Sequence, residues 1–335
     1  MKELFGSLPE EAQNKLRKRE QPDWMDPMLA TLTDRRFSDE DWIFERKLDG
    51  ERCLVFRKEE EVRLMSRNQQ RLNSTYPELV DSFEQQPVDS FIVDGEMVAF
   101  EGDLTSFSRL QERMHLEDPE EARQSDVTVY CYLFDLLYLD GYDITQAGLR
   151  HRKKLLKSAI SFEDPLRFTV HRNKEGKNYY QEACKKGWEG VIAKKADSKY
   201  VHSRSKHWLK FKCVNQQEFV IGGYTDPEGE RIGFGALLIG YYDGEDLIYA
   251  GKVGTGYSNE LLQRLSDRMS SLKQKTSPFS NEDLPEKGVH WVEPNLVGEV
   301  AFTEWTEEGK LRHPRFKGLR SDKEPGDVIR EKPEA

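Results

Sequence analysis

This sequence of 335 residues has few cysteines, no long hydrophobic run and no excess of basic residues. No apolar stretch approaches the roughly 18–20 residues that cross a bilayer, which argues against a membrane-spanning helix. Residues 1–6 lack a signal-peptide pattern, so we expect a cytoplasmic protein. Internal repeats and low-complexity tracts are also missing, which argues against a repeat architecture.

The cysteines are too few and too scattered for a disulfide framework or a zinc site. They are Cys53, Cys131, Cys184 and Cys213, and no two have the short spacing of a metal clip. Cys53 and Cys131 lie in apolar, strand-like runs. We therefore expect four free, buried thiols in a reducing compartment.

The net charge of −10, from 51 basic and 61 acidic residues, argues against a typical nucleic-acid-binding protein. The distribution of charge argues the other way, because cations gather in residues 150–157, 194–212 and 310–323. Acidic residues gather elsewhere, as at Glu59–Glu61. A solvated face explains any one such cluster, but the separation of the signs predicts a polarised surface that binds a polyanion.

The chain is long enough for two domains, and the composition, with 33% charged and 36% hydrophobic residues, is that of a soluble globular protein. We expect an α+β fold in which residues 1–214 form antiparallel sheets with flanking helices, after an N-terminal helical extension at 1–26. Residues 215–325 have the short strands and single helix of a small β-barrel such as an OB-fold, and 326–335 are expected to be a frayed tail.

Periodicity and turn residues place the elements within these domains. The expected strands are 42–47, 52–57, 62–66, 127–139, 191–194, 208–213, 219–224, 236–242, 247–253 and 296–305. Residues 91–100 are either a hairpin that turns at Asp94-Gly95 or a strand broken there. The expected helices are 8–20, 76–83, 150–160, 178–186 and 259–272.

The most informative segment is Glu45-Arg46-Lys47-Leu48-Asp49-Gly50-Glu51-Arg52. A lysine amine can form a phosphoramide and later release the phosphoryl group, which permits a covalent nucleotide intermediate. Such an amine must first lose its proton, although the ordinary pKa of lysine is about 10.4. A strand that ends in an Asp-Gly turn is the simpler interpretation of this segment alone.

The rest of the chain supplies the other groups that this chemistry needs, in a fixed order: Arg52, Arg67, Glu96, Phe134, Glu189, Lys210 and Lys212. Lys210 and Lys212 alternate with Leu209 and Phe211, so both lysines are predicted to point to one face of a strand. Each residue alone has an ordinary structural explanation, but the ordered series arises by chance far less often than any one of its members.

This series resembles the nucleotidyltransferase motifs of ATP-dependent DNA ligases over residues 27–325, and in particular the ligase module of bacterial ligase D-type end-joining enzymes. The strings Phe134-Asp135-Leu136-Leu137-Tyr138-Leu139-Asp140-Gly141 and His207-Trp208-Leu209-Lys210-Phe211-Lys212 carry the closer likeness. Arg320-Ser321-Asp322-Lys323 resembles the motif that ends the family's OB domain. Only about 45 residues precede Lys47, so we expect no large N-terminal DNA-binding domain and no polymerase or phosphoesterase module.

The resemblance implies a role for each residue. Lys47 would be the adenylated nucleophile, Glu45 would accept from the adenine amino group, and Phe134 would stack on adenine. The other implied ATP contacts are Arg52 and Glu96 at the ribose, Arg67, Lys194, Lys210 and Lys212. Glu189, helped by Asp49 or Glu96, would bind Mg²⁺ or Mn²⁺. Arg320, Asp322 and Lys323 would orient pyrophosphate, and Arg67, Lys195, Arg204 and Lys206 would contact DNA.

The resemblance therefore implies a monomeric enzyme of the bacterial cytoplasm or nucleoid that seals nicked duplex DNA in repair or end joining, with a DNA end-binding protein as a candidate partner. Three alternatives remain open. RNA ligases and GTP-using capping enzymes share the lysine-Asp-Gly core. A decayed, non-catalytic OB-fold binder is the second alternative. The third is a dinucleotide enzyme, which would rest on the glycines of residues 251–256, although their spacing better fits a barrel turn.

Overall fold

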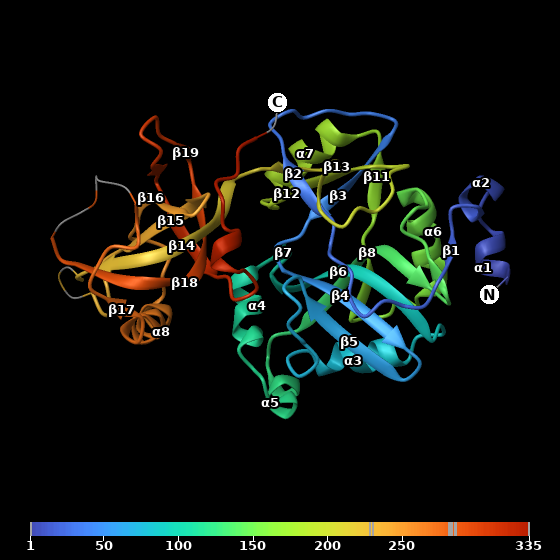
Figure 1. Cartoon of the computed structure of the whole chain (residues 1–335), viewed down its shortest axis with the longest axis horizontal. Coiled ribbons are helices and arrows are strands. Elements are labelled where there is room, and N and C mark those ends of the chain that lie inside the picture. The colour runs from blue at the N-terminus through green and yellow to red at the C-terminus, as the bar shows by residue number, and fades with distance from the viewer. Residues whose placement is uncertain (1, 228, 230, 281–283, 285–286, 334–335) are drawn as a thin grey trace. The chain divides into compact units, whose positions relative to one another are not determined.

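The computed structural model describes residues 2–227, 229, 231–280, 284 and 287–333, and it divides into two compact units (Figure 1). The first unit runs to Cys213, and the second extends from Val214 to Glu331. Among the described residues, no helix is both long enough and apolar enough to cross a membrane.

The first unit is built on two sheets. The larger has eight strands, of which six follow the order β1-β9-β8-β6-β4-β5, while β10 pairs with β8 and β7 with β6. Their bounds are β1 Arg17–Lys18, β4 Glu51–Lys58, β5 Glu61–Ser66, β6 Ser90–Glu101, β7 Leu104–Thr105, β8 Val129–Leu139, β9 Tyr142–Asp143 and β10 Leu166–Phe168. The segment at 91–100 is thus one continuous strand, and its pairing with β8 is irregular at Ile92/Val93 and at Asp94/Gly95.

The second sheet of this unit has the order β11-β3-β12-β13-β2. Its strands are β2 Leu29–Leu32, β3 Trp42–Lys47, β11 His171–Asn173, β12 Gly190–Lys195 and β13 Arg204–Lys212. One face packs on helix α7 (Gly176–Lys185) through Phe44, Val191 and Phe211. Trp208, from the other face, joins a buried cluster with Phe134 of the larger sheet, so this face looks toward the larger sheet.

The remaining helices of the first unit are α1 Lys2–Gly6, α2 Glu10–Gln13, α3 Pro77–Glu84, α4 Phe107–Met114, α5 Pro119–Gln124 and α6 Leu149–Ala159. The helix expected at 8–20 is wrong in its second half, because Arg17 and Lys18 pair as β1 with β9. Tertiary pairing overrides local propensity there.

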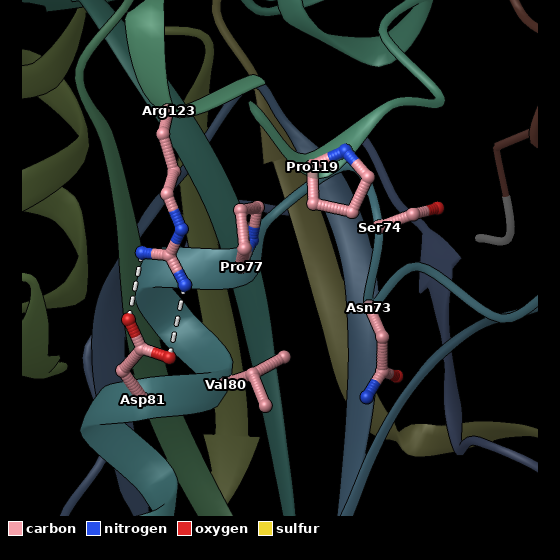
Figure 2. Close-up of a pocket in the computed structure, with 7 residues that line it drawn as sticks. All are labelled: Asn73, Ser74, Pro77, Val80, Asp81, Pro119 and Arg123. Carbon is pink, nitrogen blue, oxygen red and sulfur yellow. Dashed lines mark hydrogen bonds and ion pairs between the residues drawn. The ribbon is translucent and has the colours of Figure 1, made fainter. Parts of the chain in front are cut away.

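A surface pocket of about 320 Å³ lies between α3 and α5. Figure 2 shows Arg123 of α5 forming a double ion pair with Asp81 of α3, at 2.7 and 3.1 Å. Pro77, Val80 and Pro119 supply much of its apolar wall. None of the residues singled out in the sequence lines this pocket.

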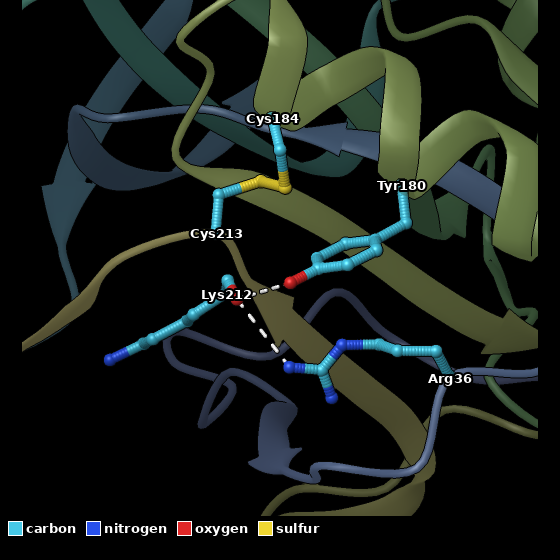
Figure 3. Close-up of a disulfide and its surroundings, with 5 residues drawn as sticks. All are labelled: Arg36, Tyr180, Cys184, Lys212 and Cys213. Carbon is cyan, nitrogen blue, oxygen red and sulfur yellow. Dashed lines mark hydrogen bonds between the residues drawn. A yellow bond between two sulfur atoms is a disulfide. The ribbon is translucent and has the colours of Figure 1, made fainter.

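Cys184 of α7 and Cys213, the residue after β13, form a disulfide, which corrects the expectation of four free thiols (Figure 3). Their Cα atoms are 5.3 Å apart despite a sequence separation of 29, because β12 lies between α7 and β13 in the chain and folds back on β13. Cys53 and Cys131 are buried and free, as expected. The carbonyl of Lys212 also accepts from the Tyr180 hydroxyl at 3.1 Å, which ties the end of β13 to α7.

The second unit is a curled antiparallel sheet in the order β16-β15-β14-β18-β17, with β21 also paired to β18. Its elements are β14 Asn215–Thr225, β15 Leu237–Asp243, β16 Asp246–Val253, α8 Asn259–Ser270, β17 Lys273–Gln274, β18 Val289–Phe302, β19 Glu304–Trp305, β20 Leu311–Arg312, β21 Arg315–Leu319 and the 3-10 helix η1 Pro325–Asp327. The arrangement is that of an OB-fold domain. Gly251 lies in β16, and Gly254 and Gly256 form the connection after it, as a barrel turn requires.

Residues 326–331 do not form the frayed tail that the sequence predicted for 326–335. Val328 is buried in the second unit, and its carbonyl accepts from the Tyr242 N–H at 2.7 Å. The Gln217 side chain likewise accepts from the Glu331 N–H. The short apolar pair Val328-Ile329 among many charged residues was too weak a signal for sequence analysis to detect this packing.

The disulfide predicts a measurable dependence of stability on reductant. Reduction should lower the unfolding free energy of the first unit by roughly 3–4 kcal/mol, because the bond closes a loop of about 30 residues in the unfolded chain. Thermal melting with and without reductant measures the effect, and thiol titration in denaturant should find two free thiols before reduction and four after it.

The double variant Cys184→Ser, Cys213→Ser is the control, and its melting should not respond to reductant. Four titratable thiols in the untreated protein would contradict the assigned bond.

Candidate active site

Three neighbouring strands place the candidate residues in rows across one face of a sheet. The register pairs Lys47 with Gly190 and Gly190 with Lys212, and it pairs Glu45 with Ile192 and Ile192 with Lys210. Residues directly opposite each other, and residues two apart in a strand, share a face. Glu45, Lys47, Lys194, Lys210 and Lys212 therefore lie on one face, opposite to the face that packs on α7. The prediction that Lys210 and Lys212 point the same way is confirmed.

The larger sheet supplies the candidate residues that lie opposite this face of the second sheet. Arg52 on β4 pairs with Glu96 on β6, which pairs with Tyr132 on β8, two residues before Phe134. Arg67 directly follows β5, whose last residue, Ser66, pairs with Cys53. The Phe134 ring is perpendicular to Trp208 of the second sheet, with centroids 6.0 Å apart. The candidate residues of the first unit thus come from both sheets.

Lys47 ends β3, and its ammonium forms a short ion pair with a carboxylate oxygen of Glu189. The other oxygen of Glu189, Oε2, is buried and has no hydrogen-bond partner among the described residues. A buried, unpaired carboxylate oxygen is costly, and a cation satisfies it well. The predicted nucleophile and the predicted metal ligand are therefore neighbours.

No group of three or more His, Cys, Asp or Glu side chains within the described ranges is placed to hold a metal ion. Asp49, expected to assist, accepts from the Phe107 N–H at 3.4 Å. Mg²⁺ at phosphoryl-transfer sites is usually held by one or two carboxylates together with substrate phosphates. Glu189 fits that mode of binding, with the nucleotide supplying further oxygens.

Glu45 lies buried between two cations. Its Oε1 accepts from Lys153 at 2.5 Å, and its Oε2 pairs with Lys194 at 2.7 Å. Burial alone would raise the pKa of the Glu45 carboxyl, but Lys153 and then Lys194 outweigh it and hold the pKa below its ordinary value. Glu45 is therefore a carboxylate at neutral pH.

Lys153 is a site residue that the sequence analysis missed. The sequence placed it in a basic surface segment at 150–157, but Arg152 and Lys153 are buried on the inner side of α6, whereas Lys154 and Lys157 are exposed. The segment at 150–157 is thus not a single surface patch. The alternation of apolar and basic residues on α6 does not show which cations have buried carboxylate partners.

Two aspartates that the sequence did not single out act as counter-ions. Asp94 holds Arg52 through two hydrogen bonds of 2.5 and 2.6 Å, and Arg52 lies 4.7 Å from the Phe134 ring centroid. Burial disfavours the charged guanidinium, but Asp94 outweighs burial and raises the pKa of Arg52. Asp135 holds Arg152 through two bonds of 2.8 Å, and both side chains are fully buried.

The residues expected to contact DNA are spread over several segments of the first unit. Alternation places Lys195 on the opposite face of β12 from Lys194, the face covered by α7, and its side chain is exposed. Arg204 and Lys206 are exposed on β13, in the part of the strand before its pairing with β2 shifts register between Ser205 and Leu209. Arg204 also donates to the Ala30 carbonyl at 2.6 Å.

The motif at 320–323 lies in the second unit, where its charges have partners. Arg320 is buried and makes two bonds of 2.8 Å to Asp322, and it contacts Glu299 at 3.3 Å. Burial would raise the pKa of Asp322, but Arg320 outweighs it and lowers the pKa. Lys323 pairs with Glu218 at 3.3 Å. These contacts stabilise the connection that follows β21.

The chain is similar to known ligases over most of its length. It matches the family model described as ATP dependent DNA ligase domain over residues 27–212, and that described as ATP dependent DNA ligase C terminal region over residues 230–323. It is 36% identical over 320 residues to a multifunctional non-homologous end joining protein LigD of Pseudomonas aeruginosa, covering 93% of this chain and 37% of that protein. For the Mycobacterium tuberculosis LigD, the identity is 39% over 316 residues, with 91% and 40% covered.

Among solved structures, a mycobacterial DNA ligase D complexed with ATP and MES matches with a TM-score of 0.66 and 36% identity. That match covers 92% of this chain and 98% of the other. The chain spans about two fifths of the length of these curated LigD relatives. The matched regions include Lys47, Lys210 and Lys212 on their strands and Glu189 directly before β12. The chain therefore belongs to the ATP-dependent DNA ligase family.

Proposed function

We propose that this chain is an ATP-dependent DNA ligase that seals nicks with a 3′-hydroxyl and a 5′-phosphate through a lysyl-AMP intermediate. The observation that carries the proposal is the arrangement of Lys47 beside Glu189, with Lys210 and Lys212 on the same face of the sheet. One primary amine, one carboxylate and two further cations are the groups needed to move a nucleotidyl group onto a lysine.

In the first step, the neutral amine of Lys47 attacks the α-phosphorus of ATP, and pyrophosphate leaves as the N–P bond forms. Lys210 and Lys212 would neutralise the charge that develops on the α-phosphate. Phe134 would stack on the base, and Arg52 and Glu96 would lie at the ribose. That a relative's structure contains ATP supports this choice of nucleotide.

A divalent cation is expected at Glu189, because a buried oxygen of that carboxylate has no hydrogen-bond partner in the described structure. When bound, Mg²⁺ would neutralise phosphate charge and compete with Lys47 for Glu189. An ammonium that loses its carboxylate partner is more easily deprotonated, and the neutral amine is the nucleophile. Asp49 and Glu96 are secondary candidates for contacts to the hydrated cation.

The later steps use the same site. The 5′-phosphate at the nick attacks the lysyl-AMP phosphorus, releases Lys47 and forms a DNA–AMP anhydride. The 3′-hydroxyl then attacks the 5′-phosphate, forms the phosphodiester bond and expels AMP. Arg67 would hold the 5′-phosphate. Arg320, Asp322 and Lys323 would serve the first step only.

The proposed substrate is nicked duplex DNA, bound mainly through phosphates because a nick has no fixed sequence. The names of the LigD relatives support a role in end joining with a DNA end-binding partner. We propose that the enzyme acts as a monomer in the bacterial cytoplasm or nucleoid. Lys206 and Arg204, both exposed on β13, are favoured as DNA contacts over Lys195, which lies on the face of the sheet that α7 covers.

Substitution of the nucleophile tests the proposal directly. Lys47→Ala should form no nucleotide adduct with labelled ATP and should seal no nick with ATP, but it should retain measurable sealing of a pre-adenylated nick. Lys58→Ala, an exposed lysine at the end of β4, is the matched control and should behave as wild type. The assay is gel separation of sealed strands after incubation with Mg²⁺.

The same assay separates the alternatives. Labelling by GTP rather than ATP would indicate a capping enzyme, and sealing of RNA nicks alone would indicate an RNA ligase. A wild-type protein that forms no adduct with either nucleotide would contradict the enzyme proposal and favour the non-catalytic binder.

The placement of the basic residues predicts different effects for two lysines. Lys206→Ala should weaken binding to nicked DNA and lower the slope of log affinity against log salt by about one. Lys195→Ala should leave both nearly unchanged, because its side chain is on the face covered by α7. Fluorescence anisotropy over a salt series measures both, and equal losses for the two variants would contradict this placement.

A further inference from the structure

A buried lysine outside the recognised motifs contacts three parts of the site proposed to bind the nucleobase of ATP. Lys153 of α6 is 2% exposed. Its ammonium donates to Glu45 Oε1 at 2.5 Å, to the Thr169 carbonyl at 3.0 Å and to the Phe134 carbonyl at 3.3 Å. All three ammonium hydrogens have acceptors, so one side chain connects the Glu45 carboxylate to the strand that carries Phe134.

Stability alone does not explain why the charged pair of Lys153 and Glu45 is buried. Buried ion pairs often contribute no more to stability than apolar side chains of similar volume, because both charges lose their hydration. Glu45 also has a second cation, Lys194, on its other oxygen. The two lysines hold the carboxylate from both sides, and each oxygen keeps a lone pair for a further donor.

An immobile carboxylate distinguishes nucleobases by their exocyclic groups. It accepts a hydrogen bond from an amino group such as that of adenine, and it repels the oxo group that guanine carries at the same position. A site built to hydrogen-bond one group rejects an analogue that lacks it more strongly than an apolar pocket does. Selection therefore depends on keeping Glu45 charged and fixed relative to the ring on which the base stacks.

We propose that Lys153 is a positioning residue for base selection, which holds Glu45 and the Phe134 strand in the geometry that accepts an amino-bearing purine and rejects an oxo-bearing one. This role rests on the proposed function, since it concerns the nucleotide used in the first step. Lys153 does not touch the nucleotide itself and acts through Glu45 and Phe134.

Two buried polar atoms without hydrogen-bond partners in the described part of the chain, close to Lys153 and Glu45, indicate that a ligand binds there. Thr169 Oγ1 and His171 Nδ1 are buried and have no hydrogen-bond partner among the described residues. Thr169 is the residue whose carbonyl binds Lys153, and His171 is the cross-strand neighbour of Glu45. Buried polar groups usually have partners, so these atoms fit a site that a polar base completes.

Charge explains why a neutral side chain cannot replace Lys153. The titratable groups that face Glu45 are Lys153 from α6, Lys194 from β12 and His171 from β11, while Tyr179 of α7, on the other face of the sheet, interacts with it electrostatically. Without Lys153, burial would be opposed mainly by Lys194, and the pKa of Glu45 would rise. A protonated Glu45 donates to an oxo group instead of repelling it, so selectivity would fall as the pH is lowered.

The test compares Lys153→Met, which removes charge and donors, with Lys153→Gln, which keeps a donor but no charge. Lys157→Met, on the exposed side of the same helix, is the matched control. The measured quantity is kcat/KM for enzyme–nucleotide adduct formation with ATP divided by that with GTP, from pH 6 to pH 8. Thermal stabilisation by ATP and by GTP supplies the same comparison for a variant too slow for rates.

We expect the ATP/GTP ratio to fall at least about tenfold for both Lys153 variants, and to fall further toward pH 6, whereas wild type and Lys157→Met keep a constant ratio. An unchanged ratio in a folded Lys153 variant overturns the inference, as does failure of both variants to fold, since Lys153 would then be a purely structural residue. Absence of any adduct in the wild type would instead overturn the proposed function, so the two failures are distinguishable.

Discussion

The pairing of β3, β12 and β13 is the constraint on which the site depends. Because side chains alternate along each strand, a register shift of one residue between β3 and β12 would place Lys47 and Glu45 on the opposite face from Lys210 and Lys212. The opposite face of the same strands packs Phe44, Val191 and Phe211 against α7, and that apolar core fixes the register. The chemistry on one face is thus positioned by packing on the other.

Buried ion pairs also hold the side chains around the site in place. Arg52 is held by Asp94, Arg152 by Asp135, and Glu45 by Lys153 and Lys194. Each pair loses hydration, and each leaves a costly unpaired charge if one partner is removed. Their concentration around Phe134 indicates that the fold maintains a rigid, charged environment where a nucleotide would be handled. Such rigidity suits phosphoryl transfer, which depends mainly on positioning and electrostatics.

Much of the site could be predicted from the sequence because its residues lie at fixed distances from strand ends. Lys47 ends a strand, Glu189 precedes one, and Lys210 and Lys212 alternate with apolar residues. Most strands could be predicted for the same reason, since alternation and turn residues are local signals. The OB-fold unit likewise followed from short strands separated by glycine-rich turns.

What could not be predicted depends on contacts between distant segments. The burial of Lys153 and Arg152 is set by carboxylates on β3 and β8, and a helix sequence contains no sign of them. The disulfide joins α7 to the end of β13, which only the folding back of β12 brings together. Residues 17–18 and 328–331 are ordered by pairing and packing with partners elsewhere in the chain.

The central claim is that the Lys47 amine becomes covalently joined to AMP. Peptide mapping by mass spectrometry, after incubation with ATP and Mg²⁺ and an acid-free digest, tests it most directly. The account predicts the mass of one adenylyl group on the peptide that contains Lys47, removed when nicked DNA is added. An adenylyl group on another residue, or none under these conditions, would contradict it.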